Sequence, residues 1–198
     1  MKVVLIDDSH FARIRRDLPR LVCSEHSSPG SGGPEIVNVA VGGACTCDLQ
    51  DQVAAAGLRP DDVVALSVGT NDAAPWKQLA VHEVAEQVDN LLADLSSQRL
   101  VYLAPPGVDE ARLNGLGDRT NARTALYGAA IGDRFAGAGA TVVDGRAAIS
   151  RVGAAAFADD GVHLSGAGYD VFIAALAAAI CTDTDYLGVV QAPGREGS

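Results

Sequence analysis

Short runs of β-branched and other apolar residues alternate along this sequence with longer segments of helical periodicity. The short runs occupy residues 2–6, 35–41, 62–68, 100–104 and 141–144. The longer segments cover residues 11–22, 49–56, 78–95, 120–135 and 167–180. Such alternation is typical of a parallel sheet whose two faces are covered by helices. The sequence therefore predicts an α/β fold with three layers, an α/β/α sandwich around a five-stranded parallel sheet.

The length of 198 residues suits one domain. We expect residues 1–190 to form it with a flavodoxin-like strand arrangement, and residues 191–198 to be a flexible tail because they lack periodicity. Residues 27–34 are rich in Ser, Gly and Pro and predict a flexible connection before the second strand.

Composition and charge exclude several classes of function. The formal net charge is -10 and the pI is about 4.7, so the long-range field repels nucleic acid and anionic membrane surfaces. No apolar run reaches the ~18 residues of a membrane-spanning helix. The first residues do not resemble a secretory signal, so we expect a cytoplasmic protein that binds neither nucleic acid nor membranes.

Cysteines are few and poorly spaced for a metal site. Without a secretory signal, Cys23, Cys45, Cys47 and Cys181 are expected to be reduced thiols. Cys45 and Cys47 form a single C-x-C with no second pair, which favours small buried side chains over zinc ligands. No metal and no cofactor is expected.

Polar residues follow the carboxyl ends of the predicted strands, where an open parallel sheet binds its ligands. Asp8 and Ser9 come after the first strand, Gly43 after the second and Asn71 after the third. His163 precedes the last helical segment. We therefore expect a hydroxyl, a glycine turn, a carboxamide and an imidazole to meet at one edge of the sheet.

Acyl transfer requires this set of groups. A serine hydroxyl is a poor nucleophile until a base removes its proton, and the base needs an acceptor on its other nitrogen. His163 is the candidate base for Ser9, and Asp160 is the candidate acceptor. The N–H groups of Ser9 and Gly43 and the amide of Asn71 are candidate donors to a substrate oxyanion. The sequence thus predicts a catalytic triad and an oxyanion hole.

The sequence resembles the SGNH, or GDSL-type, hydrolases, which are named for Ser, Gly, Asn and His in separate blocks. The matching residues are Ser9 in Asp8-Ser9, Gly43, Asn71 in Gly69-Thr70-Asn71-Asp72, and His163 with Asp160. Residues 104–110 are similar to the branch that includes isoamyl-acetate-hydrolysing esterases. The resemblance covers roughly residues 2–180 and implies a metal-independent serine hydrolase with the SGNH hydrolase fold.

Two positions depart from the family pattern. Asp7 stands where the family has a glycine before Asp-Ser, and Ala40 stands where the second block has Asn-x-Gly. Asp7 adds a carboxylate near the nucleophile, which either disfavours anionic substrates or turns to solvent.

Four further residues are predicted to contact substrate: Asp8, His10, Asp72 and Trp76. His10 is interpreted as a pocket neighbour and not as the base, because adjacent side chains at a turn diverge. Trp76 either lines the acyl or leaving-group pocket or packs in the core.

Each residue has a simpler explanation when it is taken alone. Ser9 can cap a helix, and Asn71 and Asp72 are favoured in turns. An acidic pair after the first strand also resembles a phosphoacceptor receiver, but that site needs a lysine after the fifth strand, where this chain has Asp144-Gly145. A catalytically silent SGNH-like binding domain stays open, because a fold does not fix function.

The sequence therefore predicts a serine esterase that hydrolyses small-acyl carboxylic esters through an acyl-enzyme. The alternative is a deacetylase or acyltransferase that acts on a sugar or small metabolite. The expected partner is a small-molecule ester. The sequence leaves the oligomeric state open.

Overall fold

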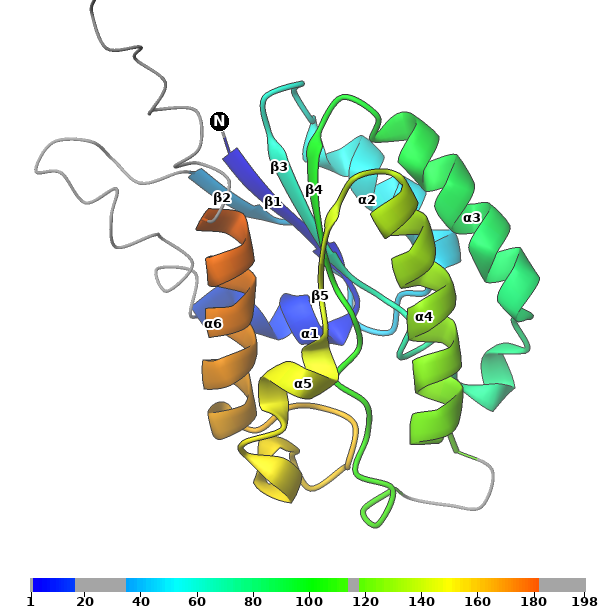
Figure 1. Cartoon of the computed structure of the whole chain (residues 1–198), viewed down its shortest axis with the longest axis vertical. Coiled ribbons are helices and arrows are strands. Elements are labelled where there is room, and N and C mark those ends of the chain that lie inside the picture. Colours follow the sequence, from blue (N-terminus) through cyan, green and yellow to red (C-terminus); the bar gives the residue numbers. More distant parts are fainter. Residues whose placement is uncertain (1, 17–34, 114–117, 182–198) are drawn as a thin grey trace, which may run out of the picture.

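The computed structural model describes residues 2–16, 35–113 and 118–181. A five-stranded sheet lies at its centre, and its strand order is β2-β1-β3-β4-β5 (Figure 1). All neighbouring strands are parallel. The strands are β1 (Lys2–Asp7), β2 (Glu35–Asn38), β3 (Val63–Ser67), β4 (Arg99–Leu103) and β5 (Thr141–Val143). From β1 the chain first adds β2 on one side and then β3, β4 and β5 on the other. At such a reversal the loops after the two neighbouring strands, here β1 and β3, turn to opposite faces of the sheet, which is where open α/β sheets bind ligands.

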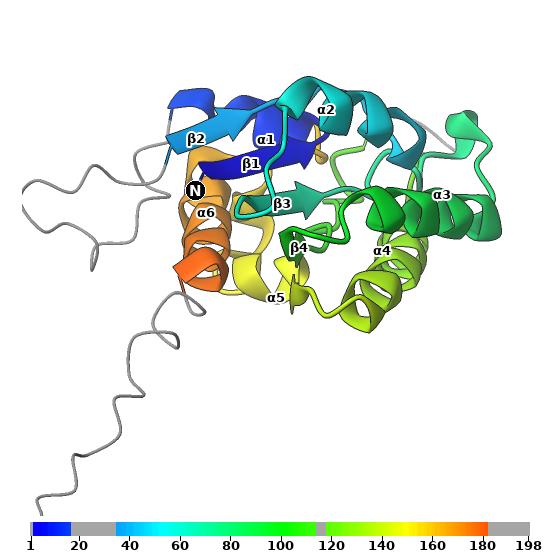
Figure 2. The same cartoon turned by 90° about the horizontal axis from the view of Figure 1, so that it is seen from above.

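Helices cover both faces of this sheet, which confirms the predicted three-layer fold (Figure 2). One face carries α1 (Ser9–Ala12), α5 (Gly145–Ile149) and α6 (Gly166–Cys181). The other carries α2 (Leu49–Ala56), α3 (Val81–Asp94) and α4 (Asn121–Gly137). Short 3-10 helices occupy Arg13–Arg16, Thr46–Asp48, Pro75–Lys77 and Gly153–Ala156.

Strand β1 shows why the apolar runs are continuous. Val3 and Leu5 belong to the core beneath α6, whereas Val4 and Ile6 belong to the core beneath α2, α3 and α4. Successive side chains of a strand point to opposite faces, so a strand covered on both sides is apolar throughout. Residues 2–7 are accordingly all buried.

Most predicted elements agree with the structure to within a few residues, two do not, and one observed helix has no predicted counterpart. The expected second strand, 35–41, ends at Asn38. The expected helix 11–22 is α1 followed by a 3-10 turn that ends at Arg16, and its remainder lies outside the described residues. Helix α5 was not predicted. The predicted connection 27–34 and tail 191–198 also lie outside the described residues.

The cysteines differ from expectation at one position. Cys45 and Cys47 are free, as predicted. Cys181, at the end of α6, is disulfide-bonded, so the prediction of a reduced thiol is wrong there. Among the described residues, no helix combines the length and apolar character needed to cross a bilayer.

Helix α6 approaches the segment before it very closely at Gly168. A Cβ atom on Gly168 would lie 2.1 Å from the backbone oxygen of Ala156. That oxygen also accepts a hydrogen bond from the N–H of Ser165, at 2.8 Å. Only glycine therefore permits this contact between α6 and the chain that leads to it.

We expect Gly168→Ala to lower the free energy of unfolding by about 1–3 kcal/mol, because the added methyl group overpacks this contact. Gly166→Ala is the matched control, since nothing lies within 4 Å of a Cβ at that helical position. Helix propensity favours alanine at both sites. Urea denaturation checks the difference, and equal stability of Gly168→Ala and the parent would contradict it.

Candidate active site

Ser9 is the first residue of α1 and follows β1 directly after Asp8. The carboxylate of Asp8 accepts hydrogen bonds through Oδ1 from the His10 N–H, at 2.8 Å, and from His10 Nδ1, at 3.0 Å. The Asp7 carboxyl accepts the Phe11 N–H at 2.9 Å. These contacts hold the turn, and the N–H of Ser9 stays among the first-turn donors that have no partner within the helix.

His163 and Asp160 lie on the loop between the 3-10 helix Gly153–Ala156 and α6. Nε2 of His163 is 3.0 Å from Oγ of Ser9, and Nδ1 is 2.6 Å from Oδ2 of Asp160. The other oxygen of Asp160 accepts the backbone N–H groups of Val162 and His163, both at 2.9 Å. The three side chains therefore form a continuous hydrogen-bonded chain.

The same contacts set the charge of Asp160. Burial alone would raise the pKa of this carboxyl, but the hydrogen bonds from the His163 ring and from two backbone N–H groups outweigh it. They hold the pKa well below its usual range. Asp160 is thus an anion wherever His163 needs an acceptor.

The loop that carries His163 is fixed from one side by the segment after β4. The N–H of Asp109 donates to the oxygen of Gly161 at 2.8 Å, and Nη1 of Arg112 donates to the oxygen of Phe157 at 2.8 Å. Gly161 has φ +70°, and a Cβ there would lie 2.6 Å from the Asp109 oxygen. Only glycine fits this turn.

Asn71 follows β3 and faces Asp8 and the loop after β2. Its Nδ2 donates to Oδ2 of Asp8 at 3.1 Å and to the oxygen of Ala44 at 3.0 Å. The next residue, Asp72, accepts the N–H and hydroxyl of Thr46 at 3.0 and 2.7 Å. These bonds join the loops that carry the nucleophile, the glycine turn and the carboxamide.

A cavity of about 580 Å³ opens at this point. Ser9, Gly42, Gly43, Asn71 and His163 line it. A Cβ on Gly42 would lie 3.9 Å from Cβ of Ser9, and Gly43 has φ +83°, which favours glycine. The cavity thus exposes a hydroxyl with its base, and it places a glycine turn and a carboxamide beside them.

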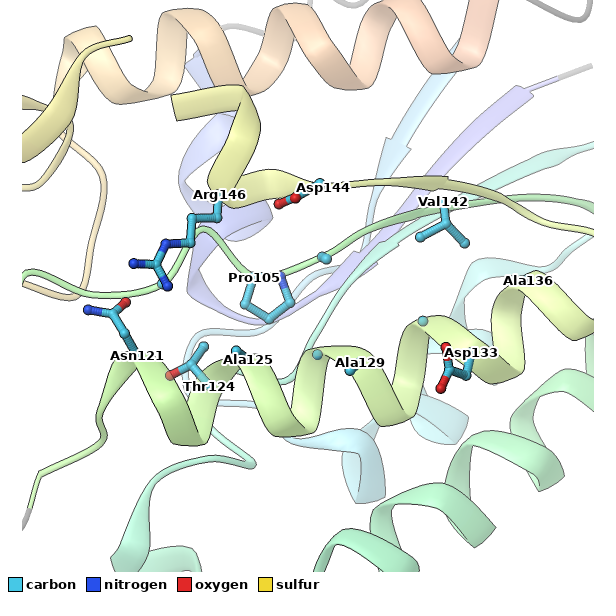
Figure 3. Close-up of a pocket in the computed structure, with 14 residues that line it drawn as sticks. Pro105, Asn121, Thr124, Ala125, Ala129, Asp133, Ala136, Val142, Asp144 and Arg146 are labelled. Carbon is cyan, nitrogen blue, oxygen red and sulfur yellow. The ribbon is translucent and has the colours of Figure 1, made fainter. Parts of the chain in front are cut away.

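A second cavity, of about 450 Å³, lies between α4 and the segment of β5 and α5 (Figure 3). Pro105 projects into it, and Asn121 and Arg146 lie near one end. Asn121 is already bonded to the backbone of Val108, and Asp144 caps α5. None of its lining residues is a serine, cysteine or histidine. The cavity at Ser9 is therefore the better candidate for chemistry.

Residues 8–171 match the family described as GDSL-like Lipase/Acylhydrolase. The chain belongs to this family. It is therefore a hydrolase, and the match spans the segments that carry Ser9, Gly43, Asn71 and His163.

Three solved structures of other proteins have the same fold as this hydrolase. A lipase/acylhydrolase from Enterococcus faecalis is 20% identical with a TM-score of 0.75, covering 91% of this chain and 95% of its own. A single-substitution mutant of Axe2, an acetyl-xylooligosaccharide esterase from Geobacillus stearmophilus, is 19% identical with a TM-score of 0.72, covering 91% and 94%. LAE5, an α/β hydrolase from the Lake Arreo metagenome, is 24% identical with a TM-score of 0.66, covering 90% and 94%. No curated protein sequence matches significantly, and nothing in these matches singles out the isoamyl-acetate branch.

The four residues predicted to contact substrate are not among those that line the cavity at Ser9. Asp8, His10 and Asp72 are buried, and they support the loops around the cavity without lining it. Trp76 is 57% exposed and also does not line the cavity. Its ring lies instead against Arg119, whose Cζ is 4.9 Å from the ring centroid.

Sequence reasoning missed the cationic lining of the cavity. Arg13 and Arg119 line it together with Asp118. No local pattern marks these residues, because Arg119 reaches the cavity from the segment after β4. Arg13 and Arg119 are far apart in the sequence, which also contains many other arginines, so nothing in the sequence signals that these two meet at one cavity.

Potential metal ligands come together in threes at two places among the described residues. One group is Asp7, Asp8 and His10, and the other is Cys45, Cys47 and Asp48. Hydrogen bonds within the protein already use the carboxylates of Asp7, Asp8 and Asp48. Burial, followed by the charge of Asp72, raises the pKa of Cys45 to about 12, which disfavours the thiolate that a metal requires. We assign no metal to either group.

Asp7, where the family has glycine, is fully buried and turns neither to substrate nor to solvent. One carboxyl oxygen accepts the Phe11 N–H, whereas Oδ1 has no partner among the described residues. Burial, and after it the neighbouring Asp8 carboxylate, raise the pKa of Asp7 well above its ordinary value. The residue therefore serves as an acceptor at the start of α1 and favours its protonated form.

Asp7→Asn should stabilise the hydrolase in a pH-dependent way. Above a pH of about 3.9 the unfolded chain releases the Asp7 proton that the folded chain keeps, so this residue lowers stability as the pH rises. Asparagine has no such linkage. The gain in Tm over the parent should grow from about pH 4 to pH 7 and vanish near pH 3.

Thermal denaturation across this range measures the effect. Glu86→Gln on the exposed face of α3 is the control, and its difference from the parent should stay flat. A gain for Asp7→Asn that is constant or falls with pH would contradict the raised pKa.

Proposed function

We propose that the chain is a serine esterase that hydrolyses esters of small carboxylic acids through an acyl-enzyme. The observation that carries this proposal is the hydrogen-bonded chain from Ser9 through His163 to Asp160, with contacts of 3.0 and 2.6 Å. Nucleophile, base and orienting carboxylate are thus in reach of one another, as acyl transfer requires.

In the proposed reaction, Oγ of Ser9 attacks the ester carbonyl while Nε2 of His163 takes its proton. Asp160 holds the ring through Nδ1 and stabilises the imidazolium that forms. The C–O bond to the alcohol then breaks, and His163 returns the proton to the departing oxygen. Water cleaves the acyl-enzyme by the same sequence and restores Ser9.

The N–H of Ser9, the N–H of Gly43 and Nδ2 of Asn71 stabilise the tetrahedral oxyanion in this mechanism. Asn71 donates to Asp8 and Ala44 in the structure. As charge develops on the oxyanion, it therefore either shares an N–H group of Asn71 with Asp8 or Ala44 or replaces one of them as its acceptor.

The surroundings of Ser9 support a small substrate. A groove of about 390 Å³ adjoins the cavity and shares Gly42 and Gly43 with it. Val39 and Val41 supply apolar lining, and Asp48, Asp51 and Gln52 supply polar lining. The charged residues that line the cavity itself include Arg119 and Asp160. An apolar acyl group beside the two valines and a hydroxyl-rich alcohol beside the charged residues would match this lining. The similarity to the acetyl-xylooligosaccharide esterase favours removal of acetyl groups from a sugar as the second candidate.

Ser9→Ala should lower the rate of p-nitrophenyl acetate hydrolysis by about three or more decades, because the triad acts as a unit. A fluorophosphonate probe should label the parent protein and not this variant. Ser150→Ala is the control, because this exposed hydroxyl bonds only to the Ala147 oxygen among the contacts described and should leave both readouts unchanged. Equal turnover of Ser9→Ala and the parent would contradict Ser9 as the nucleophile, whereas a parent without turnover or labelling would support a silent binding domain instead.

The substrate class is tested with p-nitrophenyl esters of increasing chain length alongside acetylated xylooligosaccharides. We expect kcat/KM to be highest for acetate to butyrate and to fall with longer chains, because the cavity and its groove are small and open. A preference for acetylated sugar would assign the deacetylase function. A rise in kcat/KM toward octanoate would contradict the proposal of a small acyl group.

A further inference from the structure

Arg119 is a buried cation at the edge of the proposed oxyanion site. The residue is 7% exposed and lines the cavity that contains Ser9 and Asn71. Its Nη1 donates two long hydrogen bonds of 3.4 Å, one to the backbone oxygen of Thr70 and one to Oδ1 of Asn71. The guanidinium therefore contacts the turn that carries the carboxamide as well as the carboxamide itself.

Two other groups hold this guanidinium in place. Its Nε donates to Oδ1 of Asp118 at 3.2 Å, and its Cζ lies over the ring of Trp76, 4.9 Å from the centroid. A planar guanidinium can bond through its edge and stack through its face at once, whereas an ammonium group cannot. Asp118 and Trp76 thus restrict Arg119 to the orientation that faces Asn71.

The contact with Oδ1 has two consequences for the Asn71 amide. A guanidinium has only donors, so the amide must present its oxygen to Arg119 and its NH₂ group to Asp8 and Ala44. The positive charge also polarises the amide, which makes the N–H groups of Nδ2 stronger donors. Both effects grow in importance when negative charge develops on a substrate oxygen beside Nδ2.

We propose that Arg119 is a positioning residue that orients and polarises the Asn71 amide for oxyanion stabilisation, with Trp76 and Asp118 fixing its guanidinium. This inference rests on the proposed esterase function. In this proposal Trp76 acts through Arg119, without direct contact between its ring and the substrate.

A double-mutant cycle between Arg119 and Asn71 tests the proposal. Arg119→Met should lower kcat for p-nitrophenyl acetate by about 10- to 100-fold with a much smaller change in KM, because the lost interaction matters mainly in the transition state. In an Asn71→Ala background the same substitution should cost about twofold or less, since the amide through which it acts is gone. Arg119→Lys keeps the positive charge but loses the planar guanidinium with its several N–H donors. Its kcat should therefore lie between that of the parent and that of Arg119→Met.

Arg123→Met is the matched control for loss of a stacked arginine. Arg123 also lies over an aromatic ring, with Cζ 5.2 Å from the centroid of Tyr127, and it donates to the oxygen of Ala73 at 2.7 Å. No contact described for it reaches Asn71. Its effect on kcat should therefore be the same factor in the parent and in Asn71→Ala.

Trp76 gives an independent readout, because the sequence contains one tryptophan. Removal of the guanidinium from its ring should shift the intrinsic fluorescence in Arg119→Met and Arg119→Lys, and not in Arg123→Met. An unchanged far-ultraviolet circular dichroism spectrum shows that the variants are folded. An unchanged fluorescence in a folded Arg119→Met would contradict the contact.

The outcomes separate this inference from the function on which it rests. A parent enzyme with Ser9-dependent turnover, combined with an Arg119→Met effect that is equal in both backgrounds, overturns the positioning role and leaves the esterase function intact. A parent without Ser9-dependent turnover overturns the function, and the Arg119 inference with it. Ser9-dependent turnover together with an Arg119→Met effect that disappears in the Asn71→Ala background supports both.

Discussion

The contact between Ser9 and His163 joins residues that are 154 positions apart in the chain. A base that is misplaced by an ångström loses much of its catalytic value, so both ends of this contact must be held rigidly. Ser9 is held by β1, a central strand of the sheet, and by the caps of α1. His163 is held between the segment after β4 and α6. The fold thus fixes the two residues from opposite ends of the sequence against one sheet.

Asp8 is the junction between the two halves of the proposed site. One of its oxygens accepts the backbone and ring N–H groups of His10, and the other accepts Nδ2 of Asn71. A single buried carboxylate therefore couples the turn of the nucleophile to the carboxamide after β3. The adjacent Asp7 favours its protonated form, which spares this buried region a second negative charge. Gln52 further holds the backbone of Asp7 by two hydrogen bonds of 3.0 Å.

The sequence predicted the sheet well because its strands are buried on both faces and carry continuous apolar runs. It overextended β2 for a local reason. The N–H groups of Val39 and Val41 still bond to β1, but the Asn38 side chain accepts the Ala40 N–H, and the regular strand ends there. Helix α5 was missed because it is five residues long and begins at a glycine, with Asp144 as its cap and not as the last residue of a strand. Ser9, Asn71 and His163 were recognisable because each follows or precedes a predicted element in a known block order. Arg119 was not, since its role depends on a guanidinium plane, a tryptophan ring and a carboxamide that meet only in three dimensions.

Local dipoles matter more than net charge at this site. The chain carries a net charge of -10, yet the cavity at Ser9 is lined by Arg13 and Arg119 as well as by Asp118 and Asp160. Each of these acids is bonded to a neighbour, Asp118 to Arg119 and Asp160 to His163, so neither presents an isolated negative charge to a substrate. In the proposed mechanism, the groups near a substrate oxygen are N–H donors at a helix start, at a glycine turn and on a carboxamide. A neutral ester meets no net repulsion in such a cavity, and the charge that develops on its oxygen meets fixed positive dipoles. The net charge of -10 acts at a distance and disfavours anionic substrates before they reach Ser9.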